Sequence, residues 1–308
     1  MKHLYIVNPV AGGKKNKHEK VVNEIEAFAK NHGEPYEIYI TSAPMDACEK
    51  ITSTAESGEE LRVYACGGDG TLNECANGAA NRANVAITHY PCGTGNDFIK
   101  TFGYENIDKF RNLQNLADGE VRPLDLIKCD WRYGINIASV GIDARIGTDV
   151  HKYSKIPIIG GSTGYVVSLI VNVIKGVGQK FKITVGDMTA DKKITLVCAC
   201  NGRFYGGGFN PVPDAMPDDG LLDCLIVESV SRFKVAEIVG KYAKGKFSEF
   251  PDVFTHKRCT ELNIEGDQEF VIQIDGEALY AKETKFELIP NGVNFIFPKN
   301  LSDFNPNS

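Results

Sequence analysis

The residues best suited to chemistry lie between Gly67 and Asn73, where the sequence reads Gly-Gly-Asp-Gly-Thr-Leu-Asn. They directly follow a short apolar run, residues 61–66, which predicts a buried strand. Three glycines in four positions remove side-chain bulk, so backbone amides can approach a phosphate closely. A helix that starts near Thr71 would also direct its N-terminus at that anion. Because Asp69 would repel a bare phosphate, the pattern predicts a magnesium nucleotide, with an ordinary strand-to-helix turn as the structural alternative.

Two further polar turns carry glycines. The run from Asn8 to Lys14 follows the first predicted strand and supplies glycine amides and one cation. The run from Pro91 to Phe98 offers a hydroxyl, an amide and a carboxylate, from Thr94, Asn96 and Asp97. None of the turns matches the P-loop or the dinucleotide fingerprint, so the three together predict a different kind of nucleotide site. The structural alternatives are a solvated lysine at Lys14 and a helix N-cap at Asn96 or Asp97.

Strand-like and helix-like segments alternate through the first 125 residues. This alternation predicts an open, mostly parallel sheet with helices on both faces, and such sheets bind ligands at the carboxyl ends of their strands. All three polar turns follow predicted strand ends. The predicted strands are 4–7, 36–40, 61–66 and 85–90, and the predicted helices are 17–31 and 43–56.

The pattern changes after Pro123 to short β-rich runs separated by turns. These runs predict a β-sandwich, with one amphipathic helix over 231–245 that Ser231 would cap. We therefore predict an α/β nucleotide-binding domain over 1–125, which 293–308 could complete, and an all-β domain over 126–292. The predicted strands are 133–140, 181–185, 194–200, 221–228, 261–265, 270–274, 286–289 and 293–297.

Composition narrows the function classes. A net charge of -6 argues against non-specific nucleic-acid binding, which relies on a basic surface. The nine cysteines form no Cys-x-x-Cys pair, and Cys198 and Cys200 would share one face of a strand, so buried reduced thiols are expected. The six histidines show no metal-ligand spacing.

Two segments are candidates for a signal peptide or a membrane-spanning helix. The apolar run after His3 is too short for a signal peptide, so a cytoplasmic protein is expected. Residues 156–174 carry no charge, but a proline and glycines interrupt them and leave a predicted helix over 162–176. Such a helix would be about 20 Å long, shorter than the ~30 Å hydrocarbon core, so a buried or groove-lining helix is predicted.

Several blocks, in this order, resemble the diacylglycerol kinase catalytic domain family, especially its soluble bacterial lipid kinases, which are related to sphingosine and ceramide kinases. The blocks are Asn8–Gly12, Gly67–Glu74, Gly93–Phe98 and Asp275–Glu277, joined by 136–143, 201–208 and 218–223. The resemblance covers nearly the whole chain, and only the first glycine block is shared with NAD kinases and phosphofructokinases. Cys75 and residues 209–212 depart from the family pattern without removing a chemical group.

The resemblance implies a Rossmann-like nucleotide-binding domain of the NAD kinase and diacylglycerol kinase type, a β-sandwich domain, and an active site in the cleft between them. It implies that Glu277 accepts the proton of a lipid hydroxyl, with Asp275 beside it and Asp69 in the catalytic apparatus. It implies Mg²⁺ near Asp69, Asp97 and Asp125, and a second, structural Mg²⁺ held by Met216, Asp219 and Leu221. The ATP ligands that it implies are Asn8, Pro9, Gly12, Gly13, Lys14, Thr41, Gly67, Gly68, Asp69, Gly70, Thr71, Leu72, Asn73, Thr94, Asn96 and Asp97.

The chemistry of the residues agrees with this assignment. An alcohol is a poor nucleophile, so a carboxylate that takes its proton during attack on the γ-phosphorus would help. Asp275 and Glu277 are two positions apart, and on an extended backbone they would face the same side. The alternative at this position is an Asp-Gly hairpin turn followed by a solvated glutamate.

The expected function is an ATP-dependent lipid kinase, with diacylglycerol, converted to phosphatidic acid, as the first acceptor. Phosphatidylglycerol or a sphingoid base is the next alternative, followed by a soluble substrate of the NAD kinase type and by a nucleotide sensor without catalysis. A lipid acceptor implies transient contact with the inner face of the membrane. The sequence does not decide the oligomeric state, so a homodimer stays open. The basic residues considered for membrane contact are Lys241, Lys244, Lys246, Lys257 and Arg258.

Overall fold

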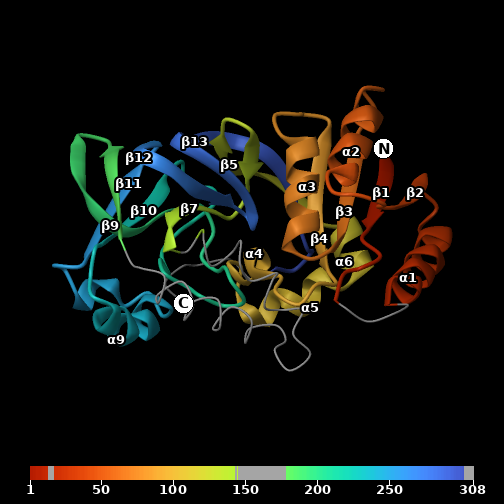
Figure 1. Ribbon diagram of the computed structural model, residues 1–308. Helices are drawn as coiled ribbons and strands as arrows, with labels where there is room; N and C mark the ends of the chain where they lie inside the picture. Colours follow the sequence, from red (N-terminus) through yellow and green to blue (C-terminus); the bar gives the residue numbers. More distant parts are fainter. Residues whose placement is uncertain (13–16, 143, 145–177, 302–308) are drawn as a thin grey trace. The chain divides into compact units, whose positions relative to one another are not determined.

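The computed structural model describes residues 1–12, 17–142, 144 and 178–301 (Figure 1). The chain divides into two compact units, Met1–Asp125 with Pro290–Ser308 and Leu126–Ile289. The boundaries predicted from the sequence were 125/126 and 292/293. The predicted phosphate ligands Gly13 and Lys14, the last residue of the 136–143 block and the predicted helix over 162–176 lie outside the described residues.

The first unit is built on a parallel sheet. Its strands are β1 (Lys2–Val7), β2 (Tyr36–Ile40), β3 (Leu61–Gly67), β4 (Val85–Pro91) and the last part of β13 (Glu277–Phe297). Their order is β2-β1-β3-β4-β13, with every neighbouring pair parallel. This is the 2-1-3-4-5 order of flavodoxin-like sheets and differs from the Rossmann order, and it puts the topological switch point between β1 and β3.

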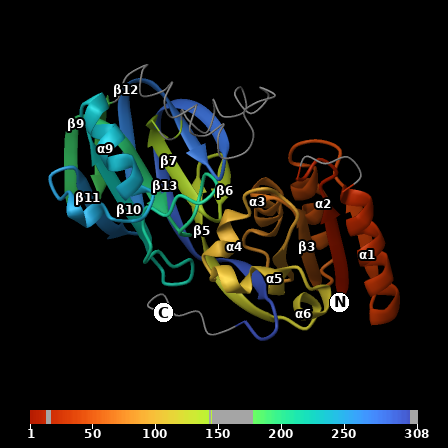
Figure 2. The ribbon, with the colours of Figure 1, turned by 90° about the horizontal axis from the view of Figure 1, so that it is seen from below.

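Helices cover both faces of this sheet. The chain runs outward from β1 to β2 and then back across to β3, so right-handed crossovers place α1 (Lys17–His32) opposite α2 (Asp46–Ala55) and α3 (Asp69–Ala79). The helices α2 and α3 lie side by side (Figures 1 and 2). Short helices follow β4, namely α4 (Asp97–Lys100), η1 (Tyr104–Asn106), α5 (Ile107–Phe110) and α6 (Leu113–Ala117).

Two helix starts differ from the predictions. The helix α2 begins at Asp46 instead of residue 43, because Met45 adopts a left-handed conformation and the Asp46 carboxylate accepts the Ser42 amide at 2.7 Å. The helix α3 begins at Asp69 instead of Thr71, so the aspartate lies in its first turn. The first correction shortens α2 and the second lengthens α3. Both fall at a helix N-terminus, where sequence propensity says little about which residue comes first.

The last strand of the chain completes the first unit. Phe295 of β13 pairs with Ile87 of β4, and the Thr88 hydroxyl donates to the Ile296 carbonyl at 2.8 Å. The rings of Phe295 and Phe297 pack on an aromatic cluster from the helices after β4, made by Phe98, Phe102 and Phe110.

The second unit is antiparallel and β-rich. Two long strands organise it, β9 (Met188–Cys200) and β12 (Glu261–Ile274), because each pairs with β8 over one half and with β7 over the other. The other elements are β5 (Glu120–Cys129), β6 (Arg132–Gly134), β7 (Ile137–Gly141), β8 (Gln179–Val185), β10 (Leu222–Glu228), α9 (Arg232–Tyr242), η2 (Phe247–Glu249), β11 (Phe254–Cys259) and the first part of β13.

Three strand predictions in this unit need correction. The run predicted over 133–140 is two strands, because the chain turns at 135–137 to direct three amides at one carboxylate. The strands predicted over 261–265 and 270–274 form the single strand β12, whose pairing with β13 shifts register between Glu265 and Phe270. The strands predicted over 286–289 and 293–297 both belong to β13.

Both faces of β9 and β10 are buried. One face contributes to the core inside the β-strands, and the other is covered by α9 through Ile238 and Tyr242. Cys198 and Cys200 lie on the face toward α9 with their Sγ atoms 3.8 Å apart, which confirms that they share a face. All nine cysteines are free thiols, and eight of them are buried.

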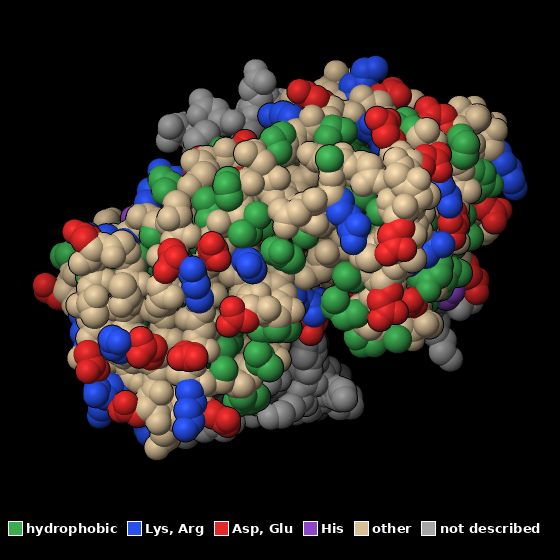
Figure 3. Space-filling model, turned by 90° about the horizontal axis from the view of Figure 1, so that it is seen from above, with side chains coloured by type: hydrophobic (Ala, Val, Ile, Leu, Met, Phe, Trp, Pro, Cys, Tyr) green, Lys and Arg blue, Asp and Glu red, His purple; other side chains and the backbone are tan. Residues whose placement is uncertain are grey.

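The surface carries charges of both signs. On the face shown in Figure 3, acidic and basic side chains alternate and hydrophobic side chains occur among them. None of the helices that the structure describes is long and apolar enough to cross a bilayer.

Candidate functional site

The predicted nucleotide residues of the first unit meet at one edge of its sheet. Asn8 follows β1, Thr41 follows β2, Gly68 follows β3 and the loop from Cys92 follows β4. Because these strands are parallel, their carboxyl ends lie at the same edge, beside the switch point between β1 and β3. The fold therefore brings together the loops that the sequence singled out.

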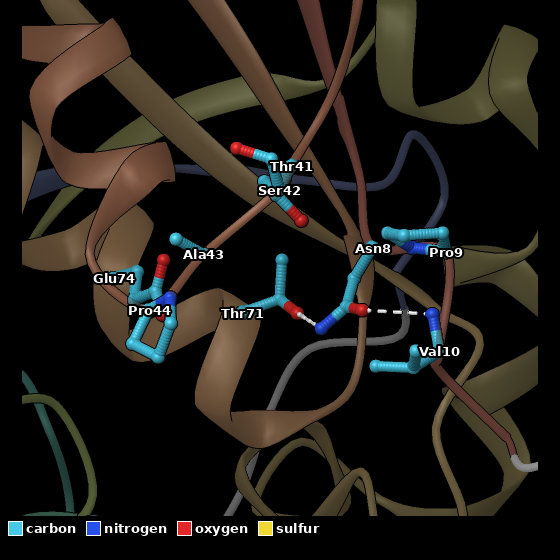
Figure 4. A pocket seen from close by; sticks show the side chains of 9 residues that line it. All are labelled: Asn8, Pro9, Val10, Thr41, Ser42, Ala43, Pro44, Thr71 and Glu74. Atoms are coloured by element: carbon cyan, nitrogen blue, oxygen red, sulfur yellow. Dashed lines mark hydrogen bonds between the residues drawn. The ribbon is translucent and has the colours of Figure 1, made fainter.

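Asn8 joins the first loop to helix α3. Its Nδ2 donates to the Thr71 hydroxyl at 3.1 Å, and its Oδ1 accepts the Val10 amide at 3.0 Å (Figure 4). A Cβ on Gly67 would lie 2.2 Å from the Thr71 hydroxyl oxygen, so only glycine allows this side chain to pack over the end of β3. Asn8 and Thr71 thus order the loops at the switch point.

A buried histidine that sequence reasoning missed holds the glycine loops together. The Gly67 carbonyl accepts the amides of Cys92 and Gly93 at 2.8 and 3.0 Å, and also His89 Nε2 at 3.1 Å. Burial lowers the pKa of His89 to about 4, so the ring is neutral at pH 7 and its Nε2 carries the donated proton. The sequence signal was a histidine within strand β4, which is buried along its whole length.

Gly93 and Gly68 pack backbone against backbone. A Cβ on Gly93 would lie 2.5 Å from the Gly68 Cα, a separation that requires one of the two loops to move. Asn96 supports this packing, since its side chain accepts the Gly93 amide at 3.2 Å and donates to the Gly93 carbonyl at 3.0 Å. Asn96 therefore shapes its loop, whereas Thr94 next to Gly93 is exposed.

Gly93→Ala is expected to weaken ATP binding by about tenfold or more, because a displacement near 1 Å at a binding loop has effects of this order. Calorimetric titration with ATP measures the change. The matched control is Gly240→Ala, whose Cβ meets nothing within 4 Å on the exposed side of α9 and which should bind ATP as the parent protein does. Unchanged ATP affinity of Gly93→Ala in a folded protein would remove this loop from the nucleotide site.

The N-terminus of α3 offers backbone amides to an anion. Its N-cap is Gly68, which has no side chain to cap the amides of the first turn. Gly70 is exposed and a Cβ there would meet nothing within 4 Å, so this turn is open to an approaching ligand. Leu72 differs, because its side chain is fully buried and its amide donates to the Gly68 carbonyl at 3.1 Å, and Asn73 is also fully buried.

A cavity of about 250 Å³ opens beside these loops. Figure 4 shows residues from the loops after β1 and β2 and from helix α3 around it, with Thr41 and Ser42 opposite Asn8 and Thr71. The lining combines hydroxyls with small apolar side chains, as ligand pockets commonly do. The lining residues that the prediction lacked are Ser42, Ala43, Pro44 and Glu74, whereas Asn8, Pro9, Val10, Thr41 and Thr71 were within it.

Two of the three acids predicted near magnesium lie together. A Cβ built on Gly95 would be 2.9 Å from an Asp69 oxygen and 3.7 Å from an Asp97 oxygen, which puts both carboxylates beside that glycine. Burial raises the pKa of Asp69 to about 6, and the neighbouring Asp97 adds to the rise. Lys100 Nζ lies 2.5 Å from Asp97. A divalent cation fits here, because it would relieve the repulsion between two carboxylates.

Asp125 is not part of this pair. It is buried in β5, and its Oδ1 accepts the Asn291 amide at 2.8 Å. Among the described residues, no group of three potential metal ligands contains Asp69, Asp97 or Asp125. Asp125 thus contacts the chain that returns at residue 291, and its predicted place near magnesium stays a prediction.

The raised pKa of Asp69 predicts a dependence of stability on pH. An acid whose folded pKa lies above its unfolded value binds more protons when folded, so its contribution to stability falls as pH rises from about 4 to about 6. Asp69→Asn should therefore be more stable than the parent at pH 7, by about 1 to 2 kcal/mol after discounting for the partial exposure of Asp69. Urea unfolding at pH 4 and pH 7 measures this, and an equal difference at both pH values would contradict it.

In the second unit, Asp275 organises three separate blocks of sequence. Its carboxylate accepts the amides of Ile135, Asn136 and Ile137 at 2.7, 3.1 and 2.8 Å. The Asn136 carbonyl in turn accepts the Asn201 and Gly202 amides, both at 2.9 Å. The blocks 136–143, 201–208 and 275–277 are therefore joined in one hydrogen-bonded network.

The expected extended backbone at Asp275 and Glu277 is wrong. Asp275 and Gly276 have φ of 48° and 95° and form a two-residue turn between β12 and β13, with Ile274 paired to Glu277. Positive φ at both positions is the type I′ hairpin that Asp-Gly favours. The Asp275 carboxylate is consequently engaged with backbone amides, and it positions the turn that presents Glu277.

Glu277 has an accessible carboxylate. Its side chain is 49% exposed, and Arg132 Nη1 lies 3.8 Å from its carboxylate, with the Arg132 side chain 7% exposed. A carboxylate that is accessible and held beside a buried arginine is suited to accept a proton from a substrate.

The predicted structural magnesium loop is held by an arginine. The Asp219 carboxylate pairs with the Arg258 guanidinium, and its Oδ1 accepts the Leu221 amide at 3.1 Å. Met216 has its Sδ 3.3 Å from the Arg203 Nη2 donor. Arg258 neutralises Asp219 in this structure. The second Mg²⁺ that the resemblance implies at Met216, Asp219 and Leu221 stays a prediction. Residue spacing within the loop carried no sign of Arg258.

Both units match known protein families. Residues 2–129 match the model of the diacylglycerol kinase catalytic domain, and residues 136–297 match the YegS C-terminal NAD kinase beta sandwich-like domain. A curated relative from Shewanella frigidimarina, "Probable lipid kinase YegS-like", is 29% identical over 78% of this chain and 77% of its own. A crystal structure of a diacylglycerol kinase from Bacillus anthracis has the same fold, with a TM-score of 0.70 at 23% identity over 96% of both chains.

The two family models together span nearly all of the chain, and the second alone covers more than half of it. The predicted resemblance is confirmed, together with the pairing of a catalytic domain and a β-sandwich-like domain. The first unit has the predicted phosphate-binding loops at one sheet edge, and the second has an exposed carboxylate on an ordered turn. This chain belongs to the lipid kinase family that joins a diacylglycerol kinase catalytic domain to a YegS C-terminal domain.

Proposed function

We propose that this protein transfers the γ-phosphate of ATP to the hydroxyl of a membrane lipid, with diacylglycerol as the first acceptor and phosphatidic acid as the product. The observation that carries the proposal is the carboxyl edge of the first sheet, where Asn8, Thr71 and the N-terminus of α3 surround a cavity in a family of lipid kinases. Phosphoryl transfer depends mainly on positioning and on neutralising charge, and this edge offers both.

The nucleotide would bind wholly to the first unit. Its base and ribose suit the cavity, where the small apolar side chains of Pro9 and Ala43 alternate with the hydroxyls of Thr41 and Ser42. Its phosphates suit the open amides at the start of α3, where the helix dipole favours negative charge. Gly12 belongs to the same loop as Asn8, and the role of Lys14 as a phosphate cation stays a prediction.

Asp69 and Asp97 would hold a magnesium ion with the nucleotide, and the ion would neutralise charge on the phosphates. When the ion leaves, Lys100 would limit the repulsion between the Asp69 and Asp97 carboxylates.

Glu277 would act as the base. As the lipid hydroxyl oxygen bonds to the γ-phosphorus, the hydroxyl proton passes to a Glu277 oxygen, and the bond from the γ-phosphorus to the bridging oxygen breaks to release ADP. Arg132 holds the Glu277 side chain, and Asp275 sets the turn that presents it.

The experiment incubates the protein with labelled ATP, Mg²⁺ and a total bacterial lipid extract, and identifies products by mass spectrometry. Labelled phosphatidic acid, absent with the Glu277→Gln variant, supports diacylglycerol as acceptor. Another labelled lipid, such as phosphorylated phosphatidylglycerol or sphingoid base, keeps the lipid kinase and changes the substrate. ATP binding without any labelled lipid favours a soluble acceptor of the NAD kinase type or a nucleotide sensor.

We also propose that residues 231–258, which include the basic residues first considered, contact an anionic membrane surface. Lys241 and Lys246 pair with Glu249, and Arg258 pairs with Asp219. The segment nevertheless carries seven Lys or Arg against three Asp or Glu, in a chain of net charge -6. It also contains Phe233, which is 90% exposed at the start of α9. An exposed aromatic among basic residues is typical of interfacial binding.

Phe233→Ala is therefore expected to weaken binding to phosphatidylglycerol-containing vesicles by about tenfold, since full burial of a Phe contributes about 1.5 to 3 kcal/mol. Vesicle sedimentation measures this, with Tyr104→Ala, an aromatic that is 58% exposed in the first unit, as the control. Equal sedimentation of both variants with the parent protein would exclude this segment as the contact surface.

A further inference from the structure

Three potential metal ligands converge at the amino end of β1. His3 lies on β1, His32 is the last residue of α1, and Glu34 lies in the connection to β2. The Glu34 carboxylate directs one oxygen to each ring, with His3 Nε2 at 2.9 Å and His32 Nε2 at 3.9 Å. One ligand atom from each of the three lies within 4.8 Å of the others. The sequence spacing gave no sign of this cluster, because His3 and His32 belong to different elements.

The surrounding residues orient both rings. His3 is 1% exposed, and its Nδ1 lies 2.8 Å from the Tyr64 hydroxyl oxygen. When Nδ1 carries the proton and donates it to Tyr64, the lone pair of Nε2 is directed at Glu34. Metal-binding histidines are commonly fixed through their second nitrogen in this way. The His32 ring is held by stacking on Phe28, with ring centroids 5.1 Å apart.

The three ligand atoms lie close enough together for side-chain rotations to enclose a small metal ion. Zinc binds nitrogen and carboxylate oxygen at about 2.0–2.2 Å, so two ligands of a tetrahedral site lie about 3.3 Å apart. The 2.9 and 3.9 Å distances run to different oxygens of Glu34, and one ligand atom from each of the three residues lies within 4.8 Å of the others. Side-chain rotations that draw these atoms together would form the site. We propose that His3, His32 and Glu34 form a binding site for Zn²⁺ or a similar divalent transition metal ion.

The ligand set indicates the class of ion and its access. Two imidazoles and one carboxylate favour zinc, nickel or cobalt over Mg²⁺, which prefers oxygen ligands. The side chains of His32 and Glu34 are 20% and 40% exposed, so the ion can enter from solvent and a water can fill the fourth position.

The position points to a structural role. Asn8 and the nucleotide loops follow the carboxyl end of β1, whereas His3 lies near its amino end, about 15–20 Å away along the strand. A metal ion here would tie β1, the end of α1 and the connection to β2 together. Because the unfolded chain lacks the assembled site, binding would stabilise the folded first unit.

The test uses the full-length protein without an affinity tag, after removal of metals by a chelator. Co²⁺ titration should produce visible ligand-field absorption of a four-coordinate site at one ion per chain, Zn²⁺ should displace it, and Zn²⁺ should raise the thermal unfolding midpoint. His32→Ala and Glu34→Gln should lose both the absorption and the shift. Tyr64→Phe should bind about 10- to 100-fold more weakly, because it keeps all three ligands but loses the hydrogen bond that orients His3.

Glu26→Gln is the matched control, since Glu26 lies on the same helix and pairs with Lys30 at the surface. It should bind Co²⁺ and Zn²⁺ as the parent does. The proposal is overturned if His32→Ala and Glu34→Gln respond to both ions like the parent protein, or if the cobalt spectrum is that of thiolate ligands. It is equally overturned if the parent protein binds neither ion more tightly than these two variants do. None of these readouts depends on kinase activity.

Discussion

Glu277→Gln is expected to lower the rate of phosphate transfer to lipid by about 10²- to 10⁴-fold, the range that a general base contributes. Glutamine keeps the size and the polarity of the side chain but cannot take up the hydroxyl proton. The carboxylate is 49% exposed, so its replacement should leave folding unaffected. ATP binding should also be unchanged, because the proposed nucleotide residues all belong to the first unit.

The measurement is the turnover number with saturating lipid and ATP, together with calorimetric ATP affinity. Glu283→Gln is the matched control, because Glu283 is exposed on the same strand and lies opposite Glu265. Removing one of two opposed like charges should be neutral or slightly stabilising. If Glu277→Gln retains the parent turnover, another group is the base. If it loses ATP binding as well, the variant does not isolate proton transfer.

Asp275→Ala is expected to lower the free energy of unfolding of the second unit by about 4 kcal/mol or more. It would leave the amides of Ile135, Asn136 and Ile137 without their acceptor, and each buried unsatisfied amide costs about 1–3 kcal/mol. The φ of 48° at this position adds a further cost of about 1–2 kcal/mol for alanine. Asp275→Asn should cost less, because asparagine tolerates this conformation and keeps one acceptor oxygen.

Urea unfolding followed by tryptophan fluorescence measures this change, because Trp131 is the single tryptophan of the chain and belongs to the second unit. Asp267→Ala is the control, since the Asp267 side chain is 76% exposed and should change stability by less than about 0.5 kcal/mol. An Asp275→Ala protein within about 1 kcal/mol of the parent would show that water replaces the carboxylate at these amides. Its kinase activity should fall with the loss of the ordered turn beside Glu277.

The sequence was most informative where structure depends on neighbours along the chain. The apolar runs before Asn8, Thr41, Gly67 and Pro91 predicted strands, and the glycines after them predicted turns, because both signals are local. The parallel arrangement followed from the alternation of strands and helices. The three predicted turns are accordingly found at one edge of one sheet.

What the sequence could not supply is the pairing of residues far apart in the chain. The order of the strands, and hence the switch point beside the cavity, depends on which apolar faces pack together. The return of Phe295 to β4 follows from packing against aromatic residues that precede it by more than 180 positions. Hydrophobic periodicity identifies a buried strand but not its neighbour.

By itself, the sequence determined the family, the two kinds of domain and the residue types available for phosphate transfer. Only the tertiary structure decided that His89 binds Gly67, that Asp275 holds three amides, and that Arg258 neutralises Asp219. It also assembled His3, His32 and Glu34 from separate elements. The physical reason is common to all of these contacts. Hydrogen bonds and charges act over a few ångströms in space, and folding brings such groups together regardless of their separation along the chain.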